Sequence, residues 1–270
     1  MKFVKDLLDK VEPLFSDGGK LEKLHPLFEA TDTILFSTDE RTKTGPHVRD
    51  SIDIKRVMIS VVIALIPCYI FGAYNIGYQR SLTFGEESSV LQNFQIGIIA
   101  LLPILVATFI SGAFWEILFA VLRRHPISEG FLVTCALIPL TLPPSIPLWQ
   151  VVIATSFGIV IGKEIFGGVG MNIFNPALMA RAFLYFTYPI NISGDKVWAL
   201  APDGYSGPTA LSIAAGKTNA DALDLIKQAS SDLVFDYSWM NMFLGWIPGS
   251  IGETNKWLII LAALFLIFMG

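Results

Sequence analysis

Long apolar runs separated by short polar breaks occupy most of the chain after about residue 56. The clearest of them are residues 57–74, 94–122 and 148–165. Each approaches the roughly 20 apolar residues that an α-helix needs to cross a hydrocarbon layer about 30 Å thick. Backbone polar groups in lipid must satisfy one another within the segment, so we expect these runs to be transmembrane helices.

Shorter apolar segments lie between and after the long runs. Residues 130–139 are apolar but short, and four prolines interrupt the stretch up to residue 147: Pro139, Pro143, Pro144 and Pro147. Residues 176–188 and 239–251 are also short, and a last apolar run ends at Gly270 without a polar tail. Proline removes a helix donor and kinks or stops a helix. The pattern therefore predicts an all-α, polytopic integral membrane protein with broken helices, cut inside a transmembrane helix.

The distribution of charge predicts how the chain crosses the membrane. Residues 1–56 hold ten lysines and arginines, which favours a cytoplasmic N-terminal segment, followed by a membrane domain at 57–270. Counting crossings from there places the glycine-rich stretch 163–170 in the cytoplasm. The polar stretch 191–236, with six acidic and three basic residues, is then extracytoplasmic.

Composition excludes several classes of protein. The chain is 53% hydrophobic and 16% charged, with a mean hydropathy of +0.58, beyond what a water-soluble domain needs. The net charge of −4 is spread along the chain, so no basic tract argues for nucleic acid. No cleavable secretory signal is visible before the first apolar run. Cys68 and Cys135 lie in apolar runs and read as buried free thiols, and the histidines form no ligand-spaced pair, so we predict no metal site.

A glycine-rich segment at residues 167–175 precedes an apolar stretch that begins with Pro176. Proline suits the first turn of a helix, where its missing N–H is not needed. Asn172 and Asn175 could bind the polar edge of a neutral heterocycle such as isoalloxazine at this helix start. Alternatively, Asn175 caps the helix and the glycines allow tight packing. The sequence leaves both interpretations open.

Glu116 lies inside a long apolar run, where an ionised carboxylate costs at least about 2.5–3.5 kcal/mol at the membrane centre. A cation pathway is the use that we favour, and an interfacial glutamate near Arg123 is the alternative. Glu164, next to Lys163, lies near a predicted cytoplasmic end, and ordinary interfacial solvation explains it. Glu253, in a glycine-broken turn, either lines a site or caps a helix.

The loop Ser206-Gly-Pro-Thr209 presents hydroxyl groups between apolar segments. A bare Ser-Gly-Pro-Thr sequence is also a natural turn with a helix cap at the threonine. A membrane protein seldom needs such a loop without a ligand, so its predicted extracytoplasmic position favours a ligand site at these hydroxyl groups.

Seven sequence blocks resemble the B subunit of the sodium-translocating NADH:quinone oxidoreductase family, in the family's order and over nearly the whole chain. They are residues 47–58, 114–116, 129–131, 163–168, 175–183, 206–209 and 249–253. The polar N-terminal segment also looks like this B subunit, rather than the related D subunit of the Rnf ferredoxin:NAD oxidoreductase. That rival, and a cofactor-free channel-like transporter, are the alternatives.

The resemblance implies a fold of inverted repeats and broken helices similar to urea transporters, of which this chain holds the first half. It implies FMN linked by a phosphoester to Thr209, within a motif that includes Ser206. It also implies noncovalent riboflavin near Asn172 and Asn175. The family usually has alanine where this chain has Pro208, which either preserves the turn or hinders the transferase.

The resemblance further implies quinone chemistry near Gly112 and Ala113, where the family tends to carry two glycines. Glu116 and Glu29 would lie on the sodium route. Electrons would pass from FMN to riboflavin and then to ubiquinone or menaquinone, coupled to sodium export. The implied setting is a six-subunit oxidoreductase and translocase in the bacterial inner membrane, with a cytoplasmic N-terminus and no residue of this chain acting as a chemical catalyst.

Overall fold

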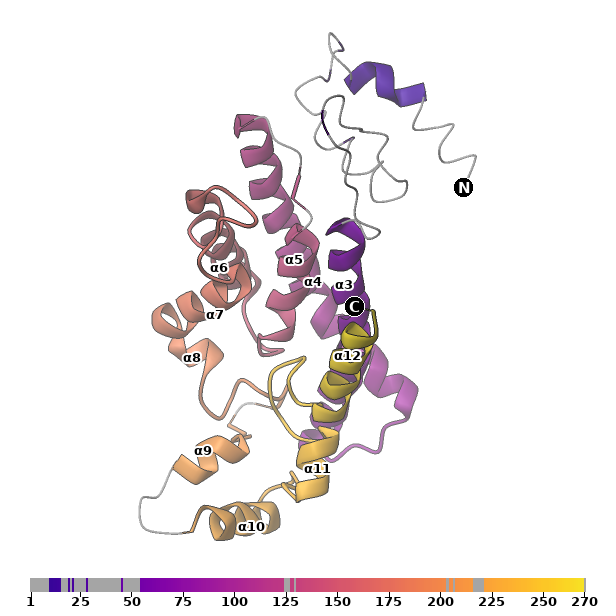
Figure 1. Cartoon of the computed structure of the whole chain (residues 1–270). Coiled ribbons are helices and arrows are strands. Elements are labelled where there is room, and N and C mark those ends of the chain that lie inside the picture. The colour runs from indigo at the N-terminus through magenta and orange to yellow at the C-terminus, as the bar shows by residue number, and fades with distance from the viewer. Residues whose placement is uncertain are drawn as a thin grey trace.

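The long helices of the chain lie side by side, and a group of short helices gathers at one end (Figure 1). The computed structural model describes residues 10–15, 54–123, 127–128, 130–202, 204–205, 207–215 and 221–269, and the single residues 19, 21, 28 and 45. No strand occurs in those ranges. The prediction of an all-α fold is therefore confirmed for the part that the structure describes.

Two long helices, α3 (Ile54–Phe84) and α4 (Val90–Arg123), pack against each other as a hairpin. They contain the first two predicted runs and extend them at both ends. The helices approach closely because Gly97 of α4 faces Ala73 of α3, where an added Cβ would collide with the Ala73 carbonyl oxygen. Small residues at a crossing let two helix backbones come together in this way.

Two short helices, α5 (Gly130–Leu140) and α7 (Pro176–Thr187), surround α6 (Leu148–Val160) in the sequence, as the broken pattern predicts. After α5 the chain turns through the proline-rich stretch, and α6 begins directly after Pro147. Together with α3 and α4 these helices form the apolar core. Its buried members include Ile104, Ile138, Leu140, Leu142, Val151, Ala154, Ala177, Ala180 and Leu184.

Three of the described helical segments are long and apolar enough to cross a membrane. They are Arg56–Phe84, Val90–Arg123 and Leu148–Phe166. The third joins α6, a turn and the 3₁₀ helix η2 (Glu164–Phe166). The chain is thus a polytopic membrane protein built on the three runs that the apolar pattern predicts.

The remaining helices lie mostly at the end of the molecule opposite to the start of α3 (Figure 1). They are α8 (Pro189–Ile192), α9 (Ala210–Ala215), α10 (Ala222–Asp232), α11 (Trp239–Leu244) and α12 (Lys256–Met269). Of these, α12 runs from that end along α3.

The predicted element over residues 239–251 is not one continuous helix. Its helical part ends at Gly245, whose φ of 92° is left-handed and caps α11. The following turn bonds to the end of α5 instead of continuing a helix. Ile251 N–H donates to the Leu142 carbonyl at 3.2 Å, and Gly252 N–H donates to the Leu140 carbonyl at 2.8 Å.

Candidate functional site

The carboxylate of Glu116 is buried, with only 2% of the residue exposed. It lies on the face of α4 that carries Thr108, Gly112 and Ala120, four residues apart, and these are buried as well. The Ser128 hydroxyl donates to Glu116 Oε1 at 2.7 Å, and the Ser128 N–H donates to the same oxygen at 3.2 Å. Protein groups therefore replace water around the Glu116 carboxylate.

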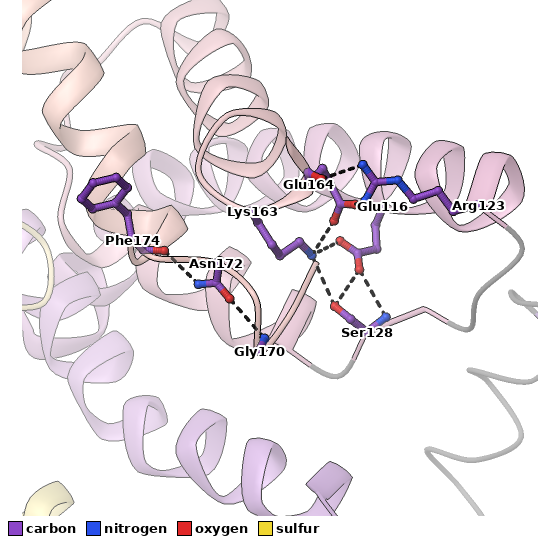
Figure 2. Close-up of polar contacts among 8 residues, drawn as sticks. All are labelled: Glu116, Arg123, Ser128, Lys163, Glu164, Gly170, Asn172 and Phe174. Atoms are coloured by element: carbon purple, nitrogen blue, oxygen red, sulfur yellow. Dashed lines mark hydrogen bonds and ion pairs between the residues drawn. The ribbon is translucent and has the colours of Figure 1, made fainter. Parts of the chain in front are cut away.

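The second oxygen of Glu116 accepts a hydrogen bond from the ammonium of Lys163 (Figure 2). Lys163 follows α6, and its N–H still donates to the Ile159 carbonyl, so the helical bonding pattern continues from the end of α6 as far as Lys163. Its own carbonyl accepts from Phe166 N–H and Gly168 N–H, which closes the turn. Gly168 has a φ of 103°, a conformation in which glycine is favoured. This turn holds the Lys163 side chain inside the molecule, 1% exposed.

Glu164 provides a second carboxylate beside the same ammonium. Lys163 Nζ lies 3.3 Å from Glu164 Oε1, and Arg123 NH1 lies 3.3 Å from Glu164 Oε2. Arg123 NH2 also donates to the Glu164 carbonyl oxygen at 2.7 Å. Arg123, at the end of α4, thus fastens the turn after α6 through two contacts with one residue.

These side chains form a charge-balanced network, which we call the buried quartet: Glu116, Lys163 and Glu164, which are buried, and Arg123, whose side chain is 35% exposed. The expectation that interfacial water solvates Glu164 is wrong, because Glu164 is 1% exposed, and so is Lys163 beside it. A buried charge is costly unless it is paired and hydrogen-bonded, and each of these groups has a partner of opposite sign. The sequence signal for this network was a Lys-Glu pair at the end of one apolar run and an unpaired glutamate inside another.

Gly112 and Ala113 lie one turn before Glu116. An added Cβ at Gly112 would collide with Cys135 Sγ and lie 3.1 Å from a ring carbon of Phe131, so this glycine lets α5 pack against α4. Ala113 is half-buried beside it. The positions predicted for quinone chemistry are therefore neighbours of the buried quartet on the same helix.

Asn172 and Asn175 both bond to nearby backbone in the segment that follows Lys163 (Figure 2). Asn175 accepts from Ala177 N–H at 2.8 Å and caps α7, which begins at Pro176. The Asn172 amide donates to the Phe174 carbonyl at 2.9 Å and accepts from Gly170 N–H at 3.3 Å. The capping interpretation of Asn175 is thus confirmed, and the segment from Asn172 to Asn175 is an irregular loop.

Thr209 is half-buried and heads α9, at the end of the molecule opposite to the C-terminal end of α4 (Figure 1). Its hydroxyl accepts from Ser212 N–H at 3.3 Å, so it caps the helix. The buried Tyr237 hydroxyl donates to the Pro208 carbonyl, and Gly207 N–H donates to the Asp195 carbonyl at 2.7 Å. The threonine therefore sits in a turn held from two sides. Burial also raises the pKa of the Tyr237 phenol, which keeps it a donor.

The structure brings some of the predicted residues together and separates others. Glu116 lies next to Gly112 and Ala113, and the loop with Asn172 and Asn175 continues from Lys163. Thr209 lies at the other end of the molecule. Two predicted residues, Glu29 and Ser206, lie outside the described residues. Within the described ranges, no group of three histidine, cysteine, aspartate or glutamate side chains is placed to hold a metal ion.

Comparisons with known proteins agree with the blocks noted in the sequence. Residues 41–270 match the model of a family described as NQR2, RnfD, RnfE. The B subunit of the Na(+)-translocating NADH-quinone reductase of Chromohalobacter salexigens is 47% identical, over 98% of this chain and 66% of that protein. The proteins of the same name from Pseudomonas aeruginosa and Azotobacter vinelandii are each 46% identical, over 93% and 98% of this chain. This chain spans 66 to 68% of the length of these relatives.

Proposed function

The chain belongs to the NQR2, RnfD, RnfE family, and on that premise we propose that it is the flavin-carrying membrane subunit of a sodium-pumping NADH:quinone oxidoreductase. The proposed complex has six subunits and lies in a bacterial inner membrane, with the start of α3 on the cytoplasmic side. The relatives' names support the sodium-dependent complex over its Rnf counterpart. FMN and riboflavin would supply the electron carriage between NADH and quinone.

The observation that carries the proposal is the position of Thr209. A half-buried hydroxyl heads a short helix at the end opposite to the start of α3, where an enzyme on the outer face could reach it. When Thr209 Oγ1 is esterified it still has lone pairs, so it can still accept the hydrogen bond from the Ser212 N–H. Attachment of a phosphate is therefore compatible with the helix cap. The bond from Tyr237 to Pro208 then orients the residue before the ester.

The fit of riboflavin to the other proposed site depends on Asn175. The Asn172 amide uses both its oxygen and its nitrogen within its own loop. In Asn175 the oxygen caps α7, while the side-chain NH₂ donates to no group among the described residues and faces an exposed surface. That NH₂ is the donor available to a heterocycle carbonyl, with Asn172 holding the loop in shape.

For the coupled cation, the chain offers the carboxylate of Glu116 inside the membrane-spanning part of α4, with Glu29 as a second carboxylate on the route. Gly112 and Ala113 would border the quinone one turn away. The proximity of these positions on α4 supports coupling between quinone chemistry and movement of a cation. Sodium here is cargo, and the chain's contribution is to hold or release it.

The direct test is NADH-driven quinone reduction in membranes that contain the assembled complex, with sodium chloride compared against choline chloride. We expect sodium to stimulate reduction in the parent complex and the Thr209→Ala complex to lose this activity. Undiminished sodium-stimulated reduction by the variant would refute the role of Thr209. Reduction of NAD+ by reduced ferredoxin would instead identify the Rnf type, and solute flux without flavin would identify a channel-like transporter.

A further inference from the structure

The buried quartet leaves no carboxylate oxygen without a donor. Glu116 Oε1 accepts from Ser128, and Glu116 Oε2 accepts from Lys163. Glu164 Oε1 lies 3.3 Å from the same ammonium, and Glu164 Oε2 lies 3.3 Å from Arg123. A dehydrated cation that binds Glu116 therefore competes with these donors for the carboxylate oxygens.

The charges in the quartet also cancel. Two carboxylates face one ammonium and one guanidinium, and three of the four side chains are 2% exposed or less. An added cation would leave an uncompensated positive charge in this buried place, which is strongly unfavourable. The cation and one resident positive group are thus in competition for Glu116.

Of the two positive groups, Lys163 is the one that can move away from Glu116. Arg123 holds Glu164 through both its carboxylate and its carbonyl, and it does not contact Glu116. Lys163 carries a compact charge on a flexible four-carbon stem and already touches both carboxylates. A small rotation of its side chain toward Glu164 keeps it paired and frees Glu116 Oε2.

We propose that Lys163 is a positioning residue that acts as a tethered competitor of the transported cation. Its ammonium occupies the Glu116 carboxylate until sodium displaces it. This inference rests on the proposed function, in which sodium passes Glu116. In the structure the Lys163 ammonium occupies the Glu116 carboxylate, at the position where the cation would bind. The affinity of the pump for sodium is then set by how firmly Lys163 holds this carboxylate.

The test replaces Lys163 with methionine, which keeps most of the stem and removes the charge, in the assembled complex. We expect the apparent KM for sodium to fall by roughly tenfold, equivalent to about 1.4 kcal/mol. Sodium chloride should also raise the melting temperature of the Lys163→Met complex more than choline chloride does, because sodium now neutralises Glu116. The matched control is Lys227→Met, a surface lysine 3.9 Å from Asp224, which should change neither property.

A double variant, Lys163→Met with Glu116→Gln, separates competition from packing. It removes one charge of each sign, so it should assemble, and its melting temperature should respond equally to the two salts. An unchanged or raised KM in Lys163→Met would overturn the proposal. So would failure of Lys163→Met to assemble at every sodium concentration, whether or not the double variant assembles, because sodium would then be unable to replace the ammonium.

These outcomes are distinct from failure of the proposed function. If the parent complex shows no sodium-stimulated quinone reduction, the proposed function fails before Lys163 is considered. If the parent is sodium-dependent and the Lys163→Met complex is not shifted, the tethered competitor alone fails. The melting temperatures report on cation binding without reference to activity.

Discussion

At the scale of single residues, two of the ion pairs among the described residues differ greatly in burial. Lys163 and Glu116 are 2% exposed at their side chains, whereas Arg181 and Glu253 are 34% and 50% exposed. The ion pair of Arg181 with Glu253 links α7 to the turn after α11. An exposed pair is screened by solvent, while breaking a buried pair leaves a charge without compensation.

We predict a large difference between two variants that each break one pair. Glu116→Gln should destabilise the protein by about 3 kcal/mol or more, because Lys163 loses one of its two carboxylates in a buried place. Arg181→Met should cost under about 1 kcal/mol. Melting temperatures of the two purified variants, compared with the parent in the same detergent and salt, measure this. Equal shifts would mean that the buried quartet is hydrated in solution.

A second residue-scale prediction concerns the turn before Thr209. Tyr237→Phe removes the hydroxyl that donates to the Pro208 carbonyl, and should cost about 1 kcal/mol of stability. It should also slow the attachment of FMN, because the turn is held less firmly. The control is Tyr205→Phe, since the Tyr205 hydroxyl has no hydrogen-bond partner among the described residues. Flavin fluorescence of the two variants in a denaturing gel, followed over time, gives the comparison, and equal rates would count against the role of Tyr237.

The sequence predicted the contacts of residues whose partners are near in the chain. It did not predict the contacts of residues whose partners are distant in the chain. Asn175 and Thr209 cap helices that begin directly after them, and that geometry is visible in neighbouring residues. Lys163 finds its partner 47 positions away on another helix, which no local pattern around Lys163 indicates. The charge of Glu116 inside an apolar run was visible, but its partner was not.

At the scale of helices, close backbone contact holds α3 and α4 together. Gly97 faces the Ala73 carbonyl, and Gly77 faces the carbonyl of Asn93, where an added Cβ would collide with the oxygen. In lipid there is little hydrophobic force between helices, so packing of this kind carries much of their association. The crossing therefore depends on two positions that have no side chain.

We predict that Gly97→Ala forces the two helices apart and destabilises the protein by at least about 1–3 kcal/mol, as overpacking does. Ile99→Ala, two residues along α4 at a side chain that is 73% exposed, should have a much smaller effect. The yield and melting temperature of each variant in detergent test the difference. A Gly97→Ala protein as stable as the parent would show that the hairpin tolerates a wider crossing.

The long helices were predictable because a membrane demands uninterrupted apolar length, and the runs at 57–74 and 94–122 have it. The segment at 239–251 was not, because its apolar residues serve a turn packed against α5. Gly245 ends α11 there, and the backbone of Ile251 and Gly252 bonds to the α5 end. Apolar composition alone does not distinguish such a buried turn from a helix.

At the scale of the whole molecule, the two proposed centres lie at opposite ends. The buried quartet is near the end of α4 that adjoins the start of α3, and Thr209 heads a helix at the other end (Figure 1). If the start of α3 is cytoplasmic, the proposed sodium site at Glu116 lies toward the cytoplasmic side of the bundle and the proposed FMN site at Thr209 lies toward the outer side. The location of α9 and α10 relative to the membrane is therefore decisive for the proposed direction of transport.

We predict that Leu223→Cys on α10 reacts with a membrane-impermeant thiol reagent applied to spheroplasts, because this residue is 63% exposed at the proposed outer face. Lys10→Cys, exposed in the N-terminal segment, should react only after the membrane is broken. Cys68 and Cys135 are buried, so the background should be low. Labelling of Lys10→Cys in intact spheroplasts, with Leu223→Cys protected, would reverse the orientation.

The measurement that tests the central claim most directly is the intact mass of the chain after coexpression with a flavin transferase, alongside in-gel fluorescence. Thr209→Ala removes the acceptor hydroxyl, and Thr209→Ser restores one. We predict a mass gain of one FMN less water and a fluorescent band in the parent, loss of both in Thr209→Ala, and recovery in Thr209→Ser. A parent chain without adduct, beside a transferase that modifies a control protein, would contradict the account, as would an adduct that persists in Thr209→Ala.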